Sequence, residues 1–324
     1  MSSTAAPGAE GGLRTRQGGA PHRSAGAAVR PRPRRSRRGA GTLLGIVLVA
    51  PLILLMLLVI GFPLVNTVLL SFQDQGVVGT PSSFVGLRTY QAILGDSALW
   101  ESLRRSGVWL VGNLVVQTVL AMATALLLTR VGRWSKAART WVLLPWVIPT
   151  VAVAVIWQWL TNSNYGLLAK GLGVLGLDGV QFFADPDWAM PTLILMNSWH
   201  WFPLGTVIIF GALQTIPGEV YEAAKVDGVN AWQMFWHITL PLLQPVLFAL
   251  GLVGTLWSFN IIDSIYLVTR GGPSGASTTA PVMIYDTAFK AFRASEAAAM
   301  SVAAIVLLGI LAWLYIRFAK PEEV

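Results

Sequence analysis

Six long stretches without a charged side chain dominate the sequence. They cover residues 39–73, 106–129, 140–169, 188–218, 228–262 and 297–316. A helix of about 20 residues crosses a hydrocarbon core about 30 Å thick, so each stretch is long enough to span a bilayer. Only 12% of the 324 residues are charged, against about a quarter in ordinary soluble domains. The pattern predicts an all-α, polytopic integral membrane protein with six transmembrane helices, and it argues against a water-soluble enzyme.

The limits of the six helices follow from the proline, glycine, asparagine and charged residues at their edges. The expected spans lie near residues 42–71, 106–130, 140–161, 190–213, 243–265 and 297–318. They form one transmembrane domain over residues 42–320. The sequence contains no cysteine, which excludes disulfides, thiolate metal ligands and a cysteine nucleophile.

The N-terminal residues 1–41 have a different composition. They are rich in Gly, Ala, Pro and Ser, and nine arginines crowd into residues 14–38. Such a segment cannot bury a core, so we expect a disordered tail. Arginines beside a first span hold that end in the cytoplasm and can contact anionic lipid headgroups. With six spans, both termini are then cytoplasmic and the protein is a multi-pass component of the plasma membrane.

Two other interpretations of the arginine-rich tail are disfavoured. A twin-arginine export signal has an apolar region of about 7–15 residues, and the apolar stretch that follows this tail is far longer. Nucleic-acid binding ranks last, because the basic residues lie next to a transmembrane span.

The cytoplasmic connection between the fourth and fifth spans has an unusual pattern. Its segment 217–245 reads PGEVYEAAKVDGVNAWQMFWHITLPLLQP. Tyr221, Ala224 and Lys225 have the spacing of a short amphipathic helix, and Gly228 is expected to end it. A second apolar helix follows before the fifth span. Two short helices on the cytoplasmic surface could dock a partner, and an interfacial helix that only links two spans is the alternative.

Residues of this segment resemble the EAA signature of the permease subunits of binding-protein-dependent ABC importers. The matching residues are Glu222, Ala223, Ala224, Asp227, Gly228, Ile238, Leu240 and Pro241. Three further segments, 84–90, 144–149 and 267–273, resemble the maltose-type carbohydrate and glycerol-phosphate uptake permeases. Two positions depart from that family: Val229 stands where alanine is usual, and Arg270 where glycine is common.

The resemblance implies a division of labour among subunits. This chain would form half of a pore with a second homologous permease, rest on two cytoplasmic ATPase subunits through the loop 217–241, and receive a sugar from an extracytoplasmic binding protein. The matching residues from Glu222 to Pro241 would couple ATP hydrolysis to the pore. A P-loop requires a Gly-Lys pair, and this sequence has none. We therefore expect no enzyme activity, no catalytic residue and no cofactor in this chain, with ATP and Mg²⁺ bound by the ATPase subunits.

Polar side chains inside the spans are the candidates for contact with substrate, because each is costly in hydrocarbon unless it faces a neighbour or a wet cavity. The candidates are Asn197, Trp201, Asn260 and Asp263. Asn197 and Trp201 are four residues apart and share a helix face. Packing roles remain open for all four, since asparagines often bond one membrane helix to another. His200 has no second histidine or carboxylate at ligand spacing, so no metal site is expected.

Two alternative functions remain open. The same kind of importer could carry glycerol phosphate or a glycerophosphodiester, but the span interiors contain no lysine or arginine to bind a phosphate. A membrane-embedded lipid-processing enzyme would need carboxylates or histidines clustered at one interface. The sequence shows no such cluster, so a carbohydrate importer, for an oligosaccharide or a polyol, is the favoured interpretation.

Overall fold

The computed structural model of the chain describes residues 38–75, 77, 80–132, 135–174, 176 and 179–319. The chain divides into two units, Met1–Leu55 and Met56–Val324. The first contains helix α1, Arg38–Met56, up to Leu55. Helix α1 begins at Arg38, and the division into a tail over residues 1–41 and a transmembrane domain from residue 42 stays a prediction. The rest of the tail, residues 1–37, lies outside the described residues.

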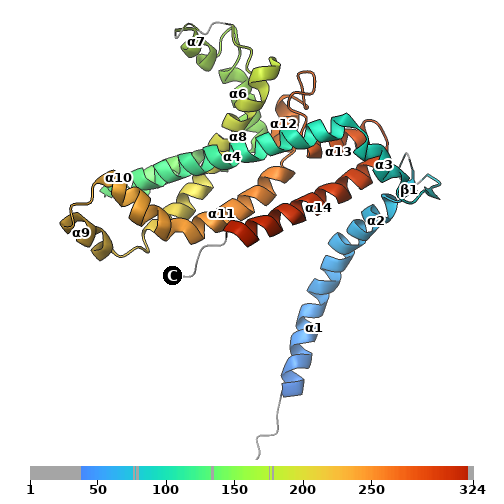
Figure 1. Cartoon of the computed structure of the whole chain (residues 1–324), viewed down its shortest axis with the longest axis horizontal. Coiled ribbons are helices and arrows are strands. Elements are labelled where there is room, and N and C mark those ends of the chain that lie inside the picture. The colour runs from blue at the N-terminus through green and yellow to red at the C-terminus, as the bar shows by residue number, and fades with distance from the viewer. Residues whose placement is uncertain are drawn as a thin grey trace, which may run out of the picture. The chain divides into compact units, whose positions relative to one another are not determined.

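The second unit is almost entirely helical (Figure 1). Its helices up to the middle of the chain are η1 Leu57–Gly61, α2 Phe62–Leu70, α3 Arg88–Leu94, α4 Ser97–Arg130, α5 Ser135–Val147, α6 Thr150–Leu160 and α7 Leu167–Val174. They are followed by α8 Pro186–Leu213, α9 Gly218–Val226, α10 Ala231–Met234, η3 Phe235–Thr239, α11 Leu240–Asn260, α12 Asp263–Val268, α13 Ala280–Phe289 and α14 Ala294–Ala319. Strands β1 Gln73–Asp74 and β2 Ser83–Phe84 form one antiparallel hairpin.

Five helical stretches of the described residues are long and apolar enough to cross a membrane. They are Gly45–Leu70, Ser97–Arg130, Pro186–Leu213, Ala231–Asn260 and Ala294–Phe318. A sixth candidate is the bent pair formed by α5 and α6. The predicted class, an all-α polytopic membrane protein, is confirmed.

The third predicted span, residues 140–161, is not one straight helix. Helices α5 and α6 meet at an angle of 93°, and α6 begins after Pro149, whose ψ of 140° is not helical. A proline disfavours the helical region for the residue before it, and Ile148 lies outside α5. The expectation of one helix over residues 140–161 rested on the length of the uncharged stretch, which does not reveal a break.

The fifth span also differs from its prediction of 243–265. A continuous helical stretch runs from Ala231 to Asn260, so the second helix expected on the cytoplasmic surface is the first part of the span itself. The helix ends at Asn260, because Ile261 is extended with ψ of 115°. Asp263 is the first residue of a separate short helix, α12, and not part of the fifth span.

Two π-helical turns lie directly before prolines. Turn η1 ends at Gly61, two residues before Pro63, and turn η3 ends at Thr239, two residues before Pro241. A proline ring inside a helix clashes with the carbonyl four residues earlier and donates no hydrogen bond. The wider π turn accommodates that carbonyl, which explains how both helices continue through a proline.

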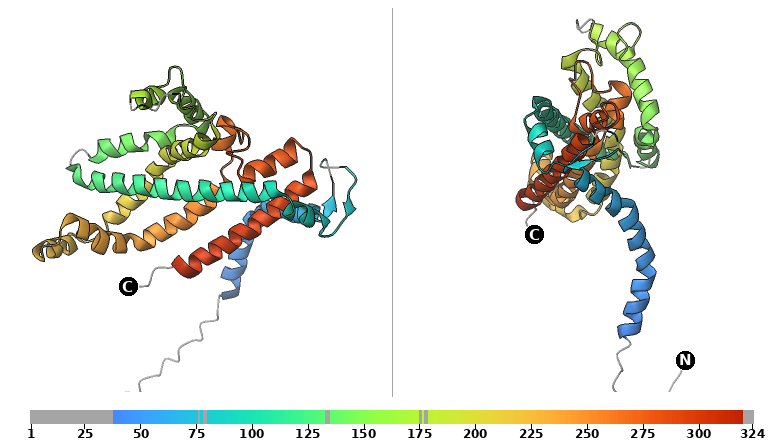
Figure 2. Two further views of the ribbon diagram at one scale, coloured as in Figure 1. Left: turned by 45° about the horizontal axis from the view of Figure 1, so that its top comes forward. Right: turned by 90° about the vertical axis from the view of Figure 1, so that its right-hand side faces the viewer.

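Helices α4 and α8 form the centre of the second unit (Figure 2). One buried cluster joins Trp109 of α4 to Leu193 and Met196 of α8, and a second cluster nearer α9 joins Ala125 to Ile209. Small residues permit a close approach of the two helices. A Cβ added at Gly205 of α8 would lie 3.2 Å from the Cβ of Ala121 on α4.

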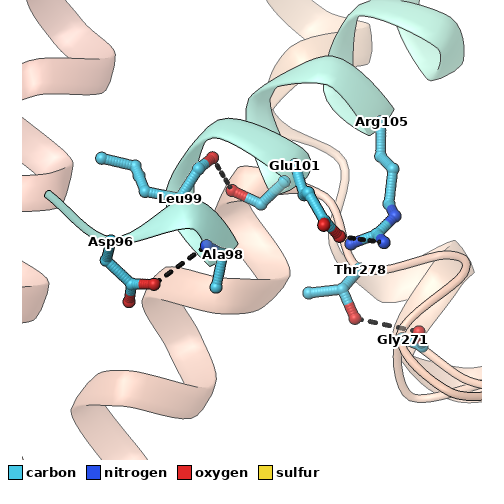
Figure 3. Close-up of polar contacts among 8 residues, drawn as sticks. Asp96, Ala98, Leu99, Glu101, Arg105, Gly271 and Thr278 are labelled. Atoms are coloured by element: carbon cyan, nitrogen blue, oxygen red, sulfur yellow. Dashed lines mark hydrogen bonds and ion pairs between the residues drawn. The ribbon is translucent and has the colours of Figure 1, made fainter. Parts of the chain in front are cut away.

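The end of this unit opposite α9 carries the β-hairpin, α3 and the loop between α12 and α13 (Figure 1). Figure 3 shows how this region is held by local polar contacts. Arg105 and Glu101 pair at 2.6 Å along α4, and the Thr278 hydroxyl donates to the Gly271 carbonyl at 2.9 Å. Arg270 has φ of 51°, in the left-handed region that favours glycine, which explains why glycine suits this position.

Candidate functional site

Helix α9, Gly218–Val226, presents the EAA residues at one end of the helical unit (Figure 1). Pro217 precedes its first turn, and Glu219 lies in that turn, where the positive end of the helix dipole favours a carboxylate. Glu222 and Ala223 are exposed, whereas Ala224 is 6% exposed. The helix therefore turns Ala224 inward and leaves Glu222 and Ala223 open to a partner.

Gly228 ends α9 in a conformation that glycine alone adopts without cost. Its φ is +76°. The Gly228 N–H donates to the Lys225 carbonyl at 3.1 Å, and the Val229 N–H donates to the Ala224 carbonyl at 3.0 Å. These bonds satisfy the last carbonyls of the helix, as in the common glycine-terminated helix end. Asp227 is exposed beside this turn.

The chain re-enters a helix two residues after Gly228. The Asn230 side chain accepts from the Gln233 N–H at 2.9 Å, and the Gln233 side chain accepts from the Asn230 N–H at 3.1 Å, a complete capping box. The Tyr221 hydroxyl lies 3.4 Å from the Thr239 hydroxyl. Helix α9 is thus tied to the base of the fifth span.

Leu240 and Pro241 take structural positions at the start of α11. Leu240 is half-buried against the core cluster between α4 and α8, and Phe235 packs on the same cluster. Pro241 lies in the first turn of α11. In contrast, the rings of Trp232 and Trp236 are exposed and contact each other at 5.5 Å between centroids.

Trp201 on α8, Asn260 at the end of α11 and Asp263 at the start of α12 form a stretch around the junction of α11 and α12. The ring of Trp201 contacts that of Trp257 edge-on at 6.3 Å, and Trp257, one turn before Asn260 on α11, is 56% exposed. The side chains of Asn260 and Asp263 are both exposed. Trp257 was not among the predicted residues, although its three-residue spacing from Asn260 could have identified it.

Asn197 lies in a buried polar network that reaches Ser264, the neighbour of Asp263. Its Nδ2 donates to Oδ1 of Asn113 at 2.7 Å, and its Oδ1 accepts from the Ser264 hydroxyl at 3.1 Å. Asn113 and Asn197 are both 0% exposed. The side chain of Asn197 joins α4, α8 and α12 and presents no free polar atom to a substrate in this conformation.

His200 is 3% exposed and faces the break between α5 and α6. Its Nε2 lies 3.0 Å from the carbonyl oxygen of Ile148. Within the described residues, no group of three or more His, Cys, Asp or Glu side chains is arranged to hold a metal ion.

A cavity of about 370 Å³ lies beside α13, at the end opposite α9. Its lining includes Asp286, Lys290 and Arg293. Lys290 pairs with Asp286 at 2.8 Å, and Arg293 with Glu296 at 2.9 Å. The hydrogen bond that the Lys290 ammonium donates to the Asp286 carboxylate raises the pKa of Lys290. Because these cations already have carboxylate partners, the cavity is not a strong anion site.

Comparison with known proteins identifies relatives of the whole helical unit. Residues 117–320 match the family model described as binding-protein-dependent transport system inner membrane component. The trehalose/maltose transport system permease protein MalF of Thermococcus litoralis is 31% identical, over 75% of this chain and 82% of its own length. The inner membrane ABC transporter permease protein YcjO of Escherichia coli is 32% identical, over 81% of this chain and 89% of its own length.

A solved structure has the same fold. It is the crystal structure of a bacterial ABC transporter involved in the import of the acidic polysaccharide alginate, and one of its chains superposes with a TM-score of 0.74 at 22% identity. The match covers 89% of this chain and 98% of that chain.

Proposed function

Because the chain belongs to the family of binding-protein-dependent transport system inner membrane components, we propose that it forms half of the translocation pathway of an ABC importer for a carbohydrate. A second homologous permease supplies the other half, two ATPase subunits drive the cycle, and an extracytoplasmic binding protein delivers the sugar. The observation that carries the proposal is helix α9, whose exposed Glu222 and Ala223 stand at one end of the unit.

Helix α9 is suited to transmit motion from an ATPase subunit. It is short, it is closed by the Gly228 turn, and it is bonded to the start of the fifth span through Tyr221 and Thr239. A displacement of α9 therefore acts directly on the helical stretch that ends at Asn260, and a rigid-body movement of this kind is a known way to switch between two states. In this arrangement α9 and both termini face the cytoplasm.

The stretch formed by Trp201, Trp257, Asn260 and Asp263 is the proposed contact with the sugar. Aromatic faces can stack on the C–H surface of a sugar ring, while the amide and carboxylate groups bond its hydroxyls. Helices α8 and α11 contain no lysine or arginine, which disfavours a phosphate substrate. The trehalose/maltose permease among the relatives supports a neutral oligosaccharide. Asn197 is proposed to position the helices and not to bind the sugar.

The test is purification of the tagged full-length chain from its native membrane, with identification of the proteins that remain bound. The complex is then reconstituted in vesicles with its binding protein, and ATP-dependent uptake of labelled maltose, trehalose and glycerol 3-phosphate is compared. Co-purification of an ATPase and a second permease, with uptake of a disaccharide, supports the proposal. Uptake of glycerol 3-phosphate alone would support the phosphate importer instead, and a chain that binds no ATPase would refute the importer function.

A further inference from the structure

The broken third span contains an irregular backbone segment that the bilayer cannot hydrate. Helix α5 ends at Val147 and α6 begins at Thr150. Inside a membrane, a carbonyl left free by such a break needs a partner from within the protein. The structure supplies one from α8, because His200 Nε2 lies 3.0 Å from the Ile148 carbonyl oxygen.

The chemistry of this contact fixes the direction of the hydrogen bond. A carbonyl oxygen only accepts, so the Nε2 nitrogen carries the hydrogen and donates. The imidazole is 3% exposed, and its Nδ1 has no hydrogen-bond partner among the described residues. The one bond that orients this buried side chain is therefore the bond to the break.

The bend places α6 against the helices that carry the proposed sugar contact. Val153 and Trp157 of α6 share a buried cluster with Leu193 of α8 and Ile265 of α12. The ring of Trp157 contacts that of Trp199 edge-on at 6.2 Å. If α5 and α6 straightened into one helix, the side chains of α6 would leave this cluster.

We propose that His200 is a positioning residue, whose Nε2–H bond to Ile148 holds the bend of the third span and keeps α6 packed on α8 and α12. Its effect on uptake rests on the proposed function, whereas its effect on the bend does not. Glutamine can place an amide nitrogen near the position of the histidine Nε2, and asparagine, one methylene shorter, cannot reach it. His200→Gln should therefore preserve the bend, and His200→Asn should lose it.

The bend can be measured directly, because the chain has no cysteine of its own. Thr140→Cys on α5 and Gln158→Cys on α6 are exposed positions that can carry nitroxide spin labels. A straight helix would separate these two backbone positions by about 27 Å. A bend of 93° reduces the separation to about 19 Å. Pulsed electron spin resonance on the assembled complex, with cysteine-free partner subunits, resolves this difference of about 8 Å.

The expected result is a short distance in the parent and in His200→Gln, and a longer or broadened distance in His200→Asn, with uptake reduced in the second variant only. Thr206→Val is the matched control, since Thr206 is also buried on α8 but donates within its own helix, to Phe202. An unchanged short distance in His200→Asn would overturn the proposal. Equal lengthening in Thr206→Val would also overturn it, because the bend would then depend on packing of α8 in general. Normal distances with no sugar uptake in the parent would count against the proposed function alone.

Discussion

A substitution at Gly228 should change the backbone of the turn that ends α9 and thereby weaken the binding of the ATPase subunits. The residue has φ of +76°, and a Cβ built on it would meet no atom within 4 Å. Any effect of Gly228→Ala therefore comes from backbone conformation and not from a steric clash with neighbours.

The expected magnitudes follow from that conformation. A left-handed residue with a Cβ costs roughly 1–2 kcal/mol, which corresponds to a roughly 5- to 30-fold loss of the correctly turned state. Asparagine tolerates this region better than alanine. Proline has φ fixed near −65° and removes the N–H that bonds the Lys225 carbonyl, so we expect a cost of about 3 kcal/mol or more. We therefore expect ATPase binding to be strongest with glycine at position 228, weaker with asparagine, weaker again with alanine and weakest with proline.

The assay is binding of the ATPase subunits to the reconstituted complex, together with sugar-stimulated ATP hydrolysis. Only the correctly turned fraction should bind, so the apparent affinity falls with that fraction. Gly218→Ala is the matched control, because Gly218 also lies in open space and does not have a positive φ. If Gly228→Pro bound and stimulated the ATPase as the parent does, the proposed role of α9 would be refuted, and equal losses at both glycines would refute the conformational reasoning.

Further predictions concern α9, the tail and the proposed sugar contact. Glu222→Ala should insert normally but lose sugar-stimulated ATP hydrolysis, and Ala223→Trp should release the ATPase subunits, as measured by co-purification. Deletion of residues 1–30 should preserve assembly and uptake, because the arginines nearest the first span remain; loss of uptake at normal membrane levels would reveal a function for the tail. Trp201→Ala should reduce uptake while basal ATP hydrolysis persists, whereas Trp199→Ala, which truncates a ring packed on Trp157, should lower thermal stability instead.

The distribution of charge along the chain was enough to predict the membrane-spanning class. An uncharged stretch reports where a helix can cross lipid, and helices α4, α8 and α14 lie where such stretches occur. Such a stretch does not reveal whether the helix is continuous. Pro149 breaks the third span, whereas Pro241 and Pro245 are accommodated within the fifth, and the same residue type therefore has opposite outcomes. A π turn, Phe235–Thr239, precedes Pro241 and accommodates it.

The contacts of individual polar residues could not be predicted in the same way. The EAA signature lies within one short segment, so its helix and its glycine turn are local properties of the sequence. Asn197, by contrast, pairs with Asn113 across 84 positions, and His200 pairs with Ile148 across 52. Such pairs are set by the rotation and depth of packed helices, and no spacing in the sequence encodes them. The sequence therefore identified Asn197 as functionally notable without revealing that its amide is already satisfied.

The two helix breaks near the proposed sugar contact are stabilised in the same way, by a side-chain hydrogen bond to a backbone carbonyl. Helix α11 ends at Asn260, where the Ser258 carbonyl receives a long bond of 3.4 Å from the Ile261 N–H, and the indole Nε1–H of Trp109 also donates to it at 2.9 Å. The carbonyl of Ile148 at the other break receives the His200 donor. In each case a side chain from a different helix donates to a carbonyl at the break, as irregular backbone in a membrane requires. Both donors are buried aromatic rings on α4 and α8, so the central helix pair supports the backbone where α6 begins and where α11 ends. Trp257 and Asn260 lie in the last turn of α11, beside this supported end, and the Trp201 ring contacts that of Trp257. The proposed sugar contact thereby has the rigidity that a selective site needs.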